Sequence, residues 1–277
     1  MSLCKVLWER LHGLTEERAL AKRLMCIIAH PDDESAGFGG ALALAALEGL
    51  ETCVVCLTDG QAASFRGAAQ TAAELGAMRR EEFAAACEVL GITRHEVLDY
   101  QDGQLELLNF LEVTEALVKR IRDWRPQVVL TFGGDGGLNT HRDHTMTSAF
   151  ATAAFHWAGR SNRFLAQMEA GLVPYQPQKL YYLSYNFLLD EREPLCPAPF
   201  SAILDVRAVQ EIKLRAFRKH TSQLPVMERI DTARAKYGPH VMEEERYALV
   251  ASHKPQLAMQ ETSLFTGVVP DVIADLA

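Results

Sequence analysis

The sequence predicts an α/β fold in which helices cover both faces of a mainly parallel sheet. Short apolar runs alternate with segments of helical composition along most of the chain, and this pattern is typical of parallel strands joined by helices. The chain has 277 residues, of which 48% are hydrophobic. It is therefore long and apolar enough to bury a substantial core within one large domain.

The individual elements follow from local composition. Strands are expected at the short apolar runs Leu24–Ile28, Thr52–Leu57, Val97–Leu98, Val128–Phe132, Leu180–Ser184 and Ala202–Val206. Helices are expected at Gly40–Leu50, Ala68–Leu90, Leu107–Trp124, His144–Trp157 and Val209–His220. Gly91 ends the longest of these helices, because glycine accepts the left-handed conformation that commonly follows a helix.

The two less regular parts of the chain give the expected domain boundaries. Leu7, Leu11 and Leu14 have helical spacing, which predicts a helical extension over residues 1–22 before a single domain over residues 23–277. The Pro-containing loop Asp190–Pro199 is the one expected insertion.

Composition and charge exclude several classes of partner. The formal net charge is −8 and the pI is about 5.6, whereas a nucleic-acid or anionic-membrane surface needs a positive field. The sequence has no run of eighteen apolar residues and no signal-peptide pattern at its N-terminus. We therefore expect no nucleic-acid partner and no stable membrane insertion. A homo-oligomer is left open.

The six cysteines are expected to be free thiols. Cys53 and Cys56 have the C-x-x-C spacing, but they lie in a run expected to form a strand. Residues three apart in a strand face opposite sides, so the two thiols cannot hold one metal. Buried free thiols indicate a reducing, cytoplasmic setting.

Polar loops directly follow two of the expected strands. His30–Glu34 follows Leu24–Ile28, and a Gly-rich turn with His141–His144 follows Val128–Phe132. Sites in such sheets lie beyond the carboxyl ends of the strands, so the two loops are expected to meet in one crevice. A catalytic zinc takes three ligands from His, Asp or Glu and keeps one position open. Helix capping by the aspartates and a core or capping role for the histidines remain the alternatives.

These loops carry a resemblance to a known family. "AHPDDE" (residues 29–34) with the later "HRDH" (residues 141–144) resembles the signatures of the LmbE-like, or PIG-L, family of zinc-dependent de-N-acetylases. "RREEFAAACEVLG", "QDG" and "KLRAFRKHTSQ" resemble further blocks of that family and occur in its order. The resemblance implies a Rossmann-like fold and deacetylase activity on an N-acetylglucosamine-type substrate.

The resemblance also implies the roles of the residues in these loops. It gives His30, Asp33 and His144 as the ligands of one Zn²⁺ per chain, with other divalent metals left open. Asp32 would be the general base towards the metal-activated water. His141, as an imidazolium, would stabilise the oxyanion of the tetrahedral intermediate. Asp32 and Asp33 can then do different jobs, because consecutive side chains of an extended loop diverge.

Further residues are implied around this set. Arg79 and Asp102 match family positions that contact the sugar or the floor of the site; an i,i+3 pair with Glu82 is the alternative for Arg79. Asp143 is expected to hold an imidazole from behind or to cap the helix that follows it. Glu34 and His220 are expected to support the site, or simply to favour a helix N-terminus and to tie a helix end in place.

The sequence departs from the family pattern at three positions. These are Gln61, where many relatives have Glu, Arg142, which replaces the Pro of H-P-D-H, and Asn139, where some relatives have Tyr. The departures spare the ligands and the base, so they concern the substrate and not the reaction.

The expected function is that of a zinc-dependent hydrolase that deacetylates an N-acetylglucosamine-type glycoconjugate. A non-catalytic sugar-binding relative is one alternative. A nucleotide-binding oxidoreductase is another, suggested by Gly37 and Gly39 after the first strand. It is disfavoured because Leu42 stands where G-x-G-x-x-G requires Gly or Ala, and because acidic side chains fill the turn.

Overall fold

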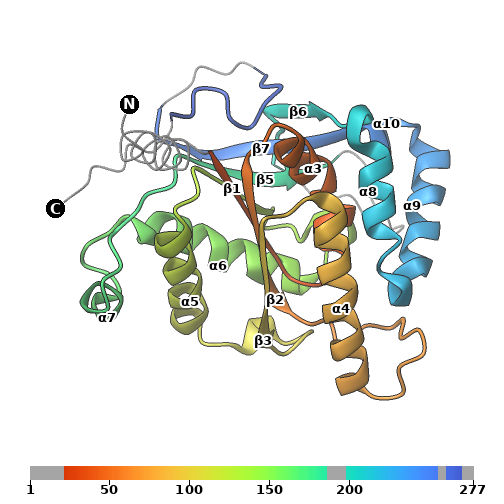
Figure 1. The fold of residues 1–277 in the computed structure, drawn as a ribbon, viewed down its shortest axis with the longest axis horizontal. Helices are drawn as coiled ribbons and strands as arrows, with labels where there is room; N and C mark the ends of the chain where they lie inside the picture. Colours follow the sequence, from red (N-terminus) through yellow and green to blue (C-terminus); the bar gives the residue numbers. More distant parts are fainter. Residues whose placement is uncertain (1–21, 186–197, 255–259, 270–277) are drawn as a thin grey trace, which may run out of the picture.

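The computed structural model describes residues 22–185, 198–254 and 260–269. Seven strands form one sheet in the order β3-β2-β1-β4-β5-β7-β6 (Figure 1). The strands are β1 Arg23–Ile28, β2 Glu51–Thr58, β3 Arg94–Tyr100, β4 Val128–Phe132, β5 Lys179–Ser184, β6 Ala202–Asp205 and β7 Glu244–Ser252. Strands β1 to β5 pair in parallel, and β7 is antiparallel to both β5 and β6. The predicted mainly parallel α/β fold is confirmed, whereas β7 was not predicted.

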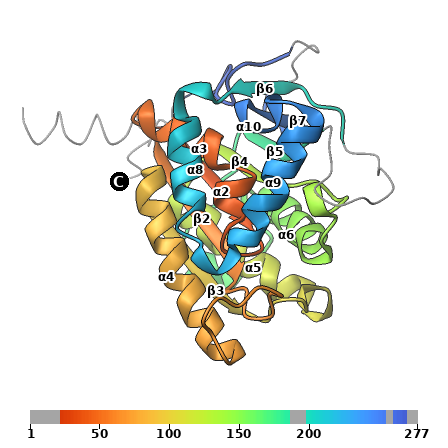
Figure 2. The ribbon, with the colours of Figure 1, turned by 90° about the vertical axis from the view of Figure 1, so that its right-hand side faces the viewer.

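Helices cover both faces of this sheet (Figures 1 and 2). They are α2 Asp33–Ala36, α3 Gly39–Leu47, α4 Ala72–Leu90, α5 Phe110–Trp124, α6 Arg142–Ala158, α7 Leu165–Glu169, α8 Gln210–Phe217, α9 Leu224–Tyr237 and α10 His240–Glu243. Residues of α3, α4 and α8 share one buried cluster with the sheet, and residues of α5 and α6 share the other. Both faces of the central strands are therefore buried, which explains why these strands read as continuous apolar runs.

Helix boundaries differ from the predicted ones where a capping residue decides them. Helix α4 starts at Ala72, four residues after the predicted start, because Thr71 caps it: the Thr71 side chain accepts the backbone N–H of Glu74, whose own side chain accepts the N–H of Thr71. Gly91 ends α4 with φ 73°, as predicted. His141 caps α6, which begins before the predicted His144. Asp143 and His144 therefore lie in the first turn of this helix.

Sheet topology brings the two polar loops together. Strands β1 and β4 are neighbours and parallel, with Leu24 opposite Val128 and Cys26 opposite Leu130. Their carboxyl ends therefore lie at the same edge of the sheet. The β1 loop leads into the short helix α2, and the Gly-rich β4 loop leads into α6.

Some predictions concern parts of the chain beyond the described residues. The helical extension over residues 1–22 lies outside them apart from Lys22, as do Cys4, Cys196 and most of the loop Asp190–Pro199. The single domain over residues 23–277 stays a prediction. Within the described ranges, no helix has the length and apolar character needed to cross a membrane.

Candidate active site

A cavity of about 380 Å³ opens where the carboxyl ends of β1 and β4 meet. Its lining combines imidazoles, carboxylates and arginines with small and apolar side chains. It is lined by His30, Asp32, Asp33, Ala36, Gly37, Ala62, Ala63, Ser64, Arg79, Asp102, Gly103, Phe132, Asn139, His141, Arg142, His144, Leu183, Gln223 and Val226. The two polar loops predicted to meet in one crevice thus line the same cavity.

Potential ligand atoms of three side chains converge in this cavity. The Nδ1 atom of His30 lies 3.3 Å from Nε2 of His144. Asp33 Oδ2 lies 3.6 Å from the first of these nitrogens, and Asp33 Oδ1 lies 3.2 Å from the second. Ligand atoms held about 2.0–2.1 Å from a tetrahedral zinc ion lie about 3.3 Å from one another. The spacing of this set therefore suits one small divalent cation.

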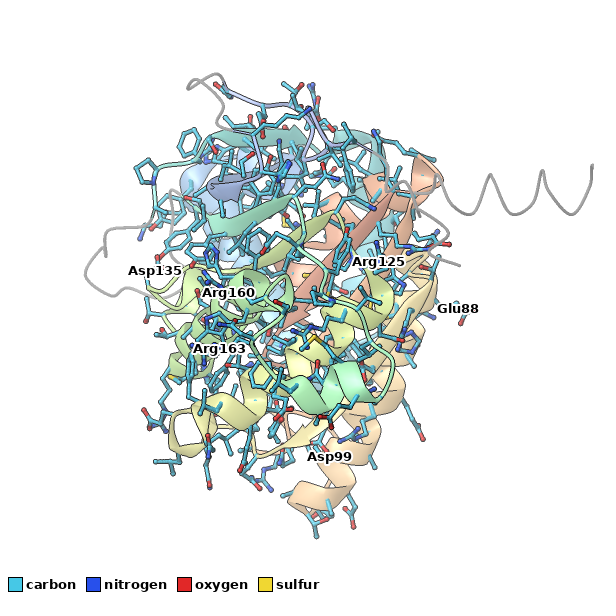
Figure 3. All side chains as sticks on the ribbon, turned by 90° about the vertical axis from the view of Figure 1, so that its left-hand side faces the viewer. Glu88, Asp99, Arg125, Asp135, Arg160 and Arg163 are labelled. Carbon is cyan, nitrogen blue, oxygen red and sulfur yellow. The ribbon has the colours of Figure 1, made fainter. Side chains whose placement is uncertain are left out.

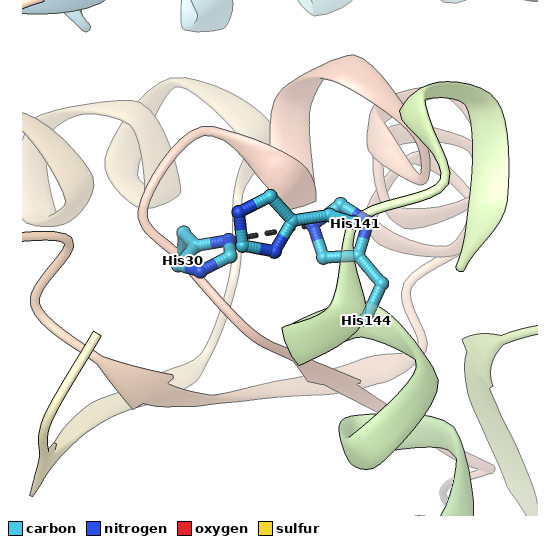
Figure 4. A group of neighbouring side chains, drawn as sticks. All are labelled: His30, His141 and His144. Carbon is cyan, nitrogen blue, oxygen red and sulfur yellow. Dashed lines mark hydrogen bonds between the residues drawn. The ribbon is translucent and has the colours of Figure 1, made fainter. Parts of the chain in front are cut away.

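The opposite edges of both imidazoles are fixed by acceptors. His144 Nδ1 lies 3.0 Å from the carbonyl oxygen of Gly136, which can only accept, so Nδ1 carries the proton and Nε2 presents its lone pair. His30 Nε2 lies 3.0 Å from Asp102 Oδ1 and 3.3 Å from Asp143 Oδ2. Carboxylates and carbonyls behind metal-binding histidines commonly fix the tautomer in this way. His144 Nε2 and His30 Nδ1 thus both face the Asp33 carboxylate, and Figure 4 shows the two rings.

The charges around His30 also suit a cation. Burial disfavours a charged His30, yet hydrogen bonds to Asp102, Asp143 and Asp33 hold its pKa well above the usual value. Burial likewise opposes ionisation of Asp33, but the neighbouring His144 and His30 hold its pKa well below the usual value. A protonated imidazole balances the carboxylates here, and a divalent ion can replace that proton. The residues present fit the predicted metal.

Asp102 and Asp143 are anchored from behind by backbone amides. Asp102 accepts the N–H of Ala62 at 3.0 Å. Burial raises the pKa of Asp102, but His30 and this amide outweigh burial and lower that pKa to about 2. Asp143 accepts the N–H groups of Gly103 at 2.6 Å and Leu105 at 3.3 Å. Together with His30 they form one possible cation set, and the three imidazoles of His30, His141 and His144 form another. The His30 nitrogen on the side of Asp102 and Asp143 donates to them, so we regard these two carboxylates as its supports.

The backbone at Asp32 separates the two adjacent carboxylates. Asp32 has φ 111°, a left-handed value for a non-glycine residue, and Asp33 begins the helix α2. The extended loop expected from the sequence is therefore a turn, and the reversal of hand is what makes the two side chains diverge. The Asp32 side chain makes no capping hydrogen bond. Burial raises its pKa to about 6, against the opposing charge of Arg79.

Arg79 lies beneath Asp32 and is 2% exposed. Its guanidinium donates to the carbonyl oxygens of Pro31 and Gly60 and lies 3.2 Å from Asp32 Oδ2. A Cβ atom on Gly60 would come within 2.1 Å of the guanidinium, so only glycine fits there. Sugar contact by Arg79 stays a prediction, because the contacts described here are with the loop that carries Asp32. The alternative pair with Glu82 does not form in the described structure; Glu82 instead accepts hydrogen bonds from Thr221 and Ser222.

His141 lines the cavity beside the ligand set (Figure 4). Its Nδ1 accepts the backbone N–H of Asp143 at 3.2 Å, so that nitrogen is unprotonated and the Nε2–H is left as donor. Burial and the two neighbouring imidazoles lower the pKa of His141 to about 4. This geometry holds a neutral ring and differs from the imidazolium expected from the sequence. His141, and not Asp143, is the residue that caps α6.

Glu34 and His220 meet away from the ligand set. Glu34 Oε1 lies 2.7 Å from His220 Nε2, and Glu34 Oε2 accepts the backbone N–H of Asp32 at 2.9 Å. The neighbouring Gln223 donates to the carbonyl oxygen of Phe65 at 3.0 Å and lines the cavity. The segment after α8 thus closes one side of the site.

Sequence reasoning missed the backbone groups that complete this site. The Gly136 carbonyl orients His144, and the amides of Ala62 and Gly103 hold the carboxylates behind His30. Side-chain patterns contain no direct signal for such groups. The runs of glycine after β4 and the Asp102-Gly103 turn were the available hints.

The N-terminus of α3 does not offer the anion site of a nucleotide-binding enzyme. The buried Glu245 carboxylate accepts the N–H groups of Gly40 at 2.6 Å and Ala41 at 2.8 Å. A pyrophosphate needs those amides, so the structure argues against the oxidoreductase alternative.

The chain resembles known proteins both in sequence and in structure. Residues 25–155 match the PIG-L family, described as GlcNAc-PI de-N-acetylase. The chain is 31% identical over 205 residues to the diacetylchitobiose deacetylase of Thermococcus kodakarensis, covering 74% of this chain and 71% of that protein. It is 32% identical over 247 residues to the 1D-myo-inositol 2-acetamido-2-deoxy-alpha-D-glucopyranoside deacetylase of Rhodococcus opacus, covering 74% and 82%. The N,N'-diacetylchitobiose deacetylase from Pyrococcus horikoshii shares the fold, with a TM-score of 0.65, 24% identity, and 100% of this chain and 98% of that chain covered.

Proposed function

This chain belongs to the PIG-L family, and we propose that it is a divalent-metal-dependent hydrolase that removes the acetyl group from an N-acetylglucosamine-type glycoconjugate. The observation that carries the proposal is the convergence of His30, Asp33 and His144 ligand atoms within 3.2–3.6 Å, beside the separate carboxylate of Asp32. Zn²⁺ is the proposed ion, at one per chain, because two imidazoles and one carboxylate with an open position form a typical catalytic zinc set.

The proposed reaction divides the work among the residues of the cavity. A divalent ion held by His30, Asp33 and His144 would polarise the amide carbonyl and acidify a water molecule. Asp32 takes a proton from the attacking water as its oxygen bonds to the carbonyl carbon. The Nε2–H of His141 donates to the oxyanion of the tetrahedral intermediate. Asp32 then returns the proton to the sugar nitrogen as the C–N bond breaks, which releases acetate and a free amine.

The size of the cavity supports a sugar headgroup as the substrate. A volume of about 380 Å³ lies at the lower end of the range of about 300–1,000 Å³ that is usual for small-molecule sites. The two relatives named above act on a disaccharide and on an inositol glycoside, and both substrates carry a 2-acetamido sugar. We propose that this sugar is the common element, and that Asn139 and Arg142, which line the cavity, contact whatever is attached to it. Gln61 does not line the cavity and accepts the backbone N–H of Asp102 at 3.4 Å.

The surface supports the absence of a nucleic-acid partner. The net charge is −8, and Figure 3 shows Glu88, Asp99 and Asp135 on the same view as Arg125, Arg160 and Arg163. Arg125 lies 4.7 Å from the ring centre of Tyr175 and Arg163 lies 4.4 Å from that of Trp157. Arg125 and Arg163 thus pack on aromatic rings. The free, buried Cys26, Cys53, Cys56 and Cys87 support the proposed cytoplasmic setting.

Acetate release by the zinc-loaded protein tests the proposal. The substrates to compare are N,N'-diacetylchitobiose, the 2-acetamido glucoside of myo-inositol, the malate glycoside of N-acetylglucosamine, and free N-acetylglucosamine. We expect turnover of at least one glycoside, and none after chelation of the metal. Tight binding of these sugars without acetate release would instead support a non-catalytic sugar-binding protein. No binding and no release would contradict both readings.

A further inference from the structure

A buried carboxylate–imidazole pair lies directly behind the proposed base. Glu34 and His220 are both fully buried, and neither lines the cavity. Their Oε1 and Nε2 atoms lie 2.7 Å apart, although the two residues are 186 positions apart in the chain. They therefore take no direct part in binding substrate, and their effect on the reaction must pass through another residue.

That residue is Asp32. The second carboxylate oxygen of Glu34 accepts the backbone N–H of Asp32 at 2.9 Å. Asp32 has φ 111°, which L side chains rarely adopt and which persists only when the surroundings enforce it. The Glu34 carboxylate is the acceptor that fixes the direction of this N–H, and with it the plane of the peptide that carries the Asp32 side chain.

His220 in turn fixes the Glu34 carboxylate. It follows α8, which packs on α2 and α3 (Figure 2). A buried carboxylate without a partner would turn towards water or take up a proton. The imidazole of His220 and the hydroxyl of Ser35 both donate to Glu34 Oε1, which leaves Oε2 to face the amide of Asp32. Oε1 thus accepts from His220 and Ser35, and Oε2 accepts from the Asp32 amide.

We propose that the Glu34–His220 pair positions Asp32 for catalysis, by holding its backbone in the left-handed conformation that aims its carboxylate away from the metal ligands. The inference rests on the proposed function, in which Asp32 is the base. Glu34 and His220 are positioning residues here. Arg79 holds the carboxylate end of Asp32, whereas this pair holds its main-chain end.

Kinetics of Glu34→Gln and Glu34→Ala provide the first test. Residues that orient a catalytic group from behind typically contribute about 10–100-fold to activity. We expect a loss of that order in kcat for Glu34→Ala, with KM changed by less than about twofold because the substrate contacts remain. The loss should be smaller for Glu34→Gln, whose amide oxygen can still accept the Asp32 N–H. Bound metal should stay at the wild-type amount.

The matched control is Glu261→Gln. Glu261 is 6% exposed, pairs with Lys179 at 2.8 Å and does not line the cavity. This variant should lose stability as Glu34→Gln does, yet keep its kcat. A Glu34→Ala variant that loses only stability, with wild-type kcat, would overturn the positioning role.

Hydrogen exchange at the Asp32 amide tests the same inference without using activity. Loss of its acceptor should speed exchange of this amide about tenfold in Glu34→Ala, the usual worth of one hydrogen bond, both with metal and after chelation. The control Glu261→Gln should leave it unchanged. If the wild-type protein released no acetate but this amide still responded, the proposed function would fail and the structural coupling would stand. An unchanged exchange rate in Glu34→Ala would refute the coupling itself.

Discussion

Two adjacent aspartates differ in chemistry here because the backbone changes hand between them. Asp32 lies at φ 111° and Asp33 opens a helix, so one carboxylate faces Arg79 and the other faces two imidazoles. The environments push their pKa values apart, with that of Asp32 raised to about 6 by burial and that of Asp33 held well below its usual value. Such divergence is typical of pairs that play different roles in one reaction.

The first prediction separates these two carboxylates. Asp32→Asn keeps the shape of the side chain but removes its basicity, so it should retain the metal and lose about 10²–10⁴ in kcat, the usual contribution of a positioned general base. Asp33→Asn replaces a charged ligand with a poor one, so it should lose metal affinity and regain activity when zinc is in excess. Elemental analysis and kcat measured side by side decide this. A metal-free Asp32→Asn with a metal-loaded, inert Asp33→Asn would mean that the roles are exchanged.

The second prediction concerns Arg79, because a positioning role and a sugar-binding role would change different kinetic constants. Its guanidinium holds Pro31, Gly60 and Asp32. If this is its function, Arg79→Lys should lower kcat by about 10–100-fold with little change in KM, since Lys cannot span three acceptors in one plane. If Arg79 binds the sugar, as the family resemblance implies, KM should rise instead. Arg80→Lys, at the half-exposed neighbour that pairs with Asp99, should change neither.

In strand β2, the alternation of side chains along the strand determines which face of the sheet each residue occupies. Cys53 belongs to the cluster under α5 and α6, and Cys56 belongs to the cluster under α3 and α4. The prediction that these thiols cannot share a metal is confirmed, because they lie on opposite faces of the sheet. Both are buried and free.

The third prediction follows from that burial. Burial raises the pKa of Cys53 to about 12 and raises that of Cys56 well above its usual range. At pH 8 only about 1 in 10⁴ of the Cys53 side chains is then a thiolate, against roughly a quarter for a free cysteine. Cys53 and Cys56 should therefore resist a thiol reagent in the native protein at pH 8 and react after denaturation. Peptide mapping after a timed reaction identifies the modified residues, and rapid native labelling of Cys53 would contradict the burial.

Elements were predicted well where the chain itself encodes them. Val128–Phe132 was predicted to the residue because a fully buried strand is an uninterrupted apolar run. Strand β7 was missed because Glu244–Ser252 carries charges that find their partners only in the folded protein, such as Glu245 with Lys213 of α8 at 2.6 Å. The turn at Asp32 was also missed, since this left-handed aspartate depends on groups far away in the sequence, namely Arg79 and the His220 that holds Glu34.

At the scale of the molecule, the site joins segments that the sequence keeps far apart. The proposed ligands come from the loops after β1 and β4, Asp102 follows β3, and His220 follows α8. The resemblance named these residues, and the parallel sheet order explains why their loops meet. The particular atoms could not be predicted, because the tautomer of His144 depends on the carbonyl of Gly136 and that of His30 on two carboxylates.

The last prediction concerns the negative charge that the fold gathers around His30. Asp33, Asp102 and Asp143 surround one imidazole within 3.0–3.6 Å, so in the absence of a cation the native state holds their charge with protons alone. A metal that binds only the native state adds about 4 kcal/mol of stability when its free concentration is 1,000 times its Kd. For a chain of this size that corresponds to a rise in Tm of about 8–16 °C. Thermal unfolding of chelated protein, with and without added Zn²⁺, should show this rise and a bound metal content of about one per chain.

His30→Ala and Asp123→Asn make the comparison specific. His30→Ala removes one proposed ligand, and with it the imidazole that pairs with Asp102 and Asp143. Zinc should therefore no longer raise the Tm of this variant. Asp123→Asn breaks only an exposed pair with Arg94, which is worth little, so its response should equal that of the wild type. Equal Tm values for metal-free and zinc-loaded wild-type protein would show that His30, Asp33 and His144 do not form a metal site. A full response in His30→Ala would show that the metal binds elsewhere, because the fold would then gain its stability without the imidazole that joins the ligands to Asp102 and Asp143.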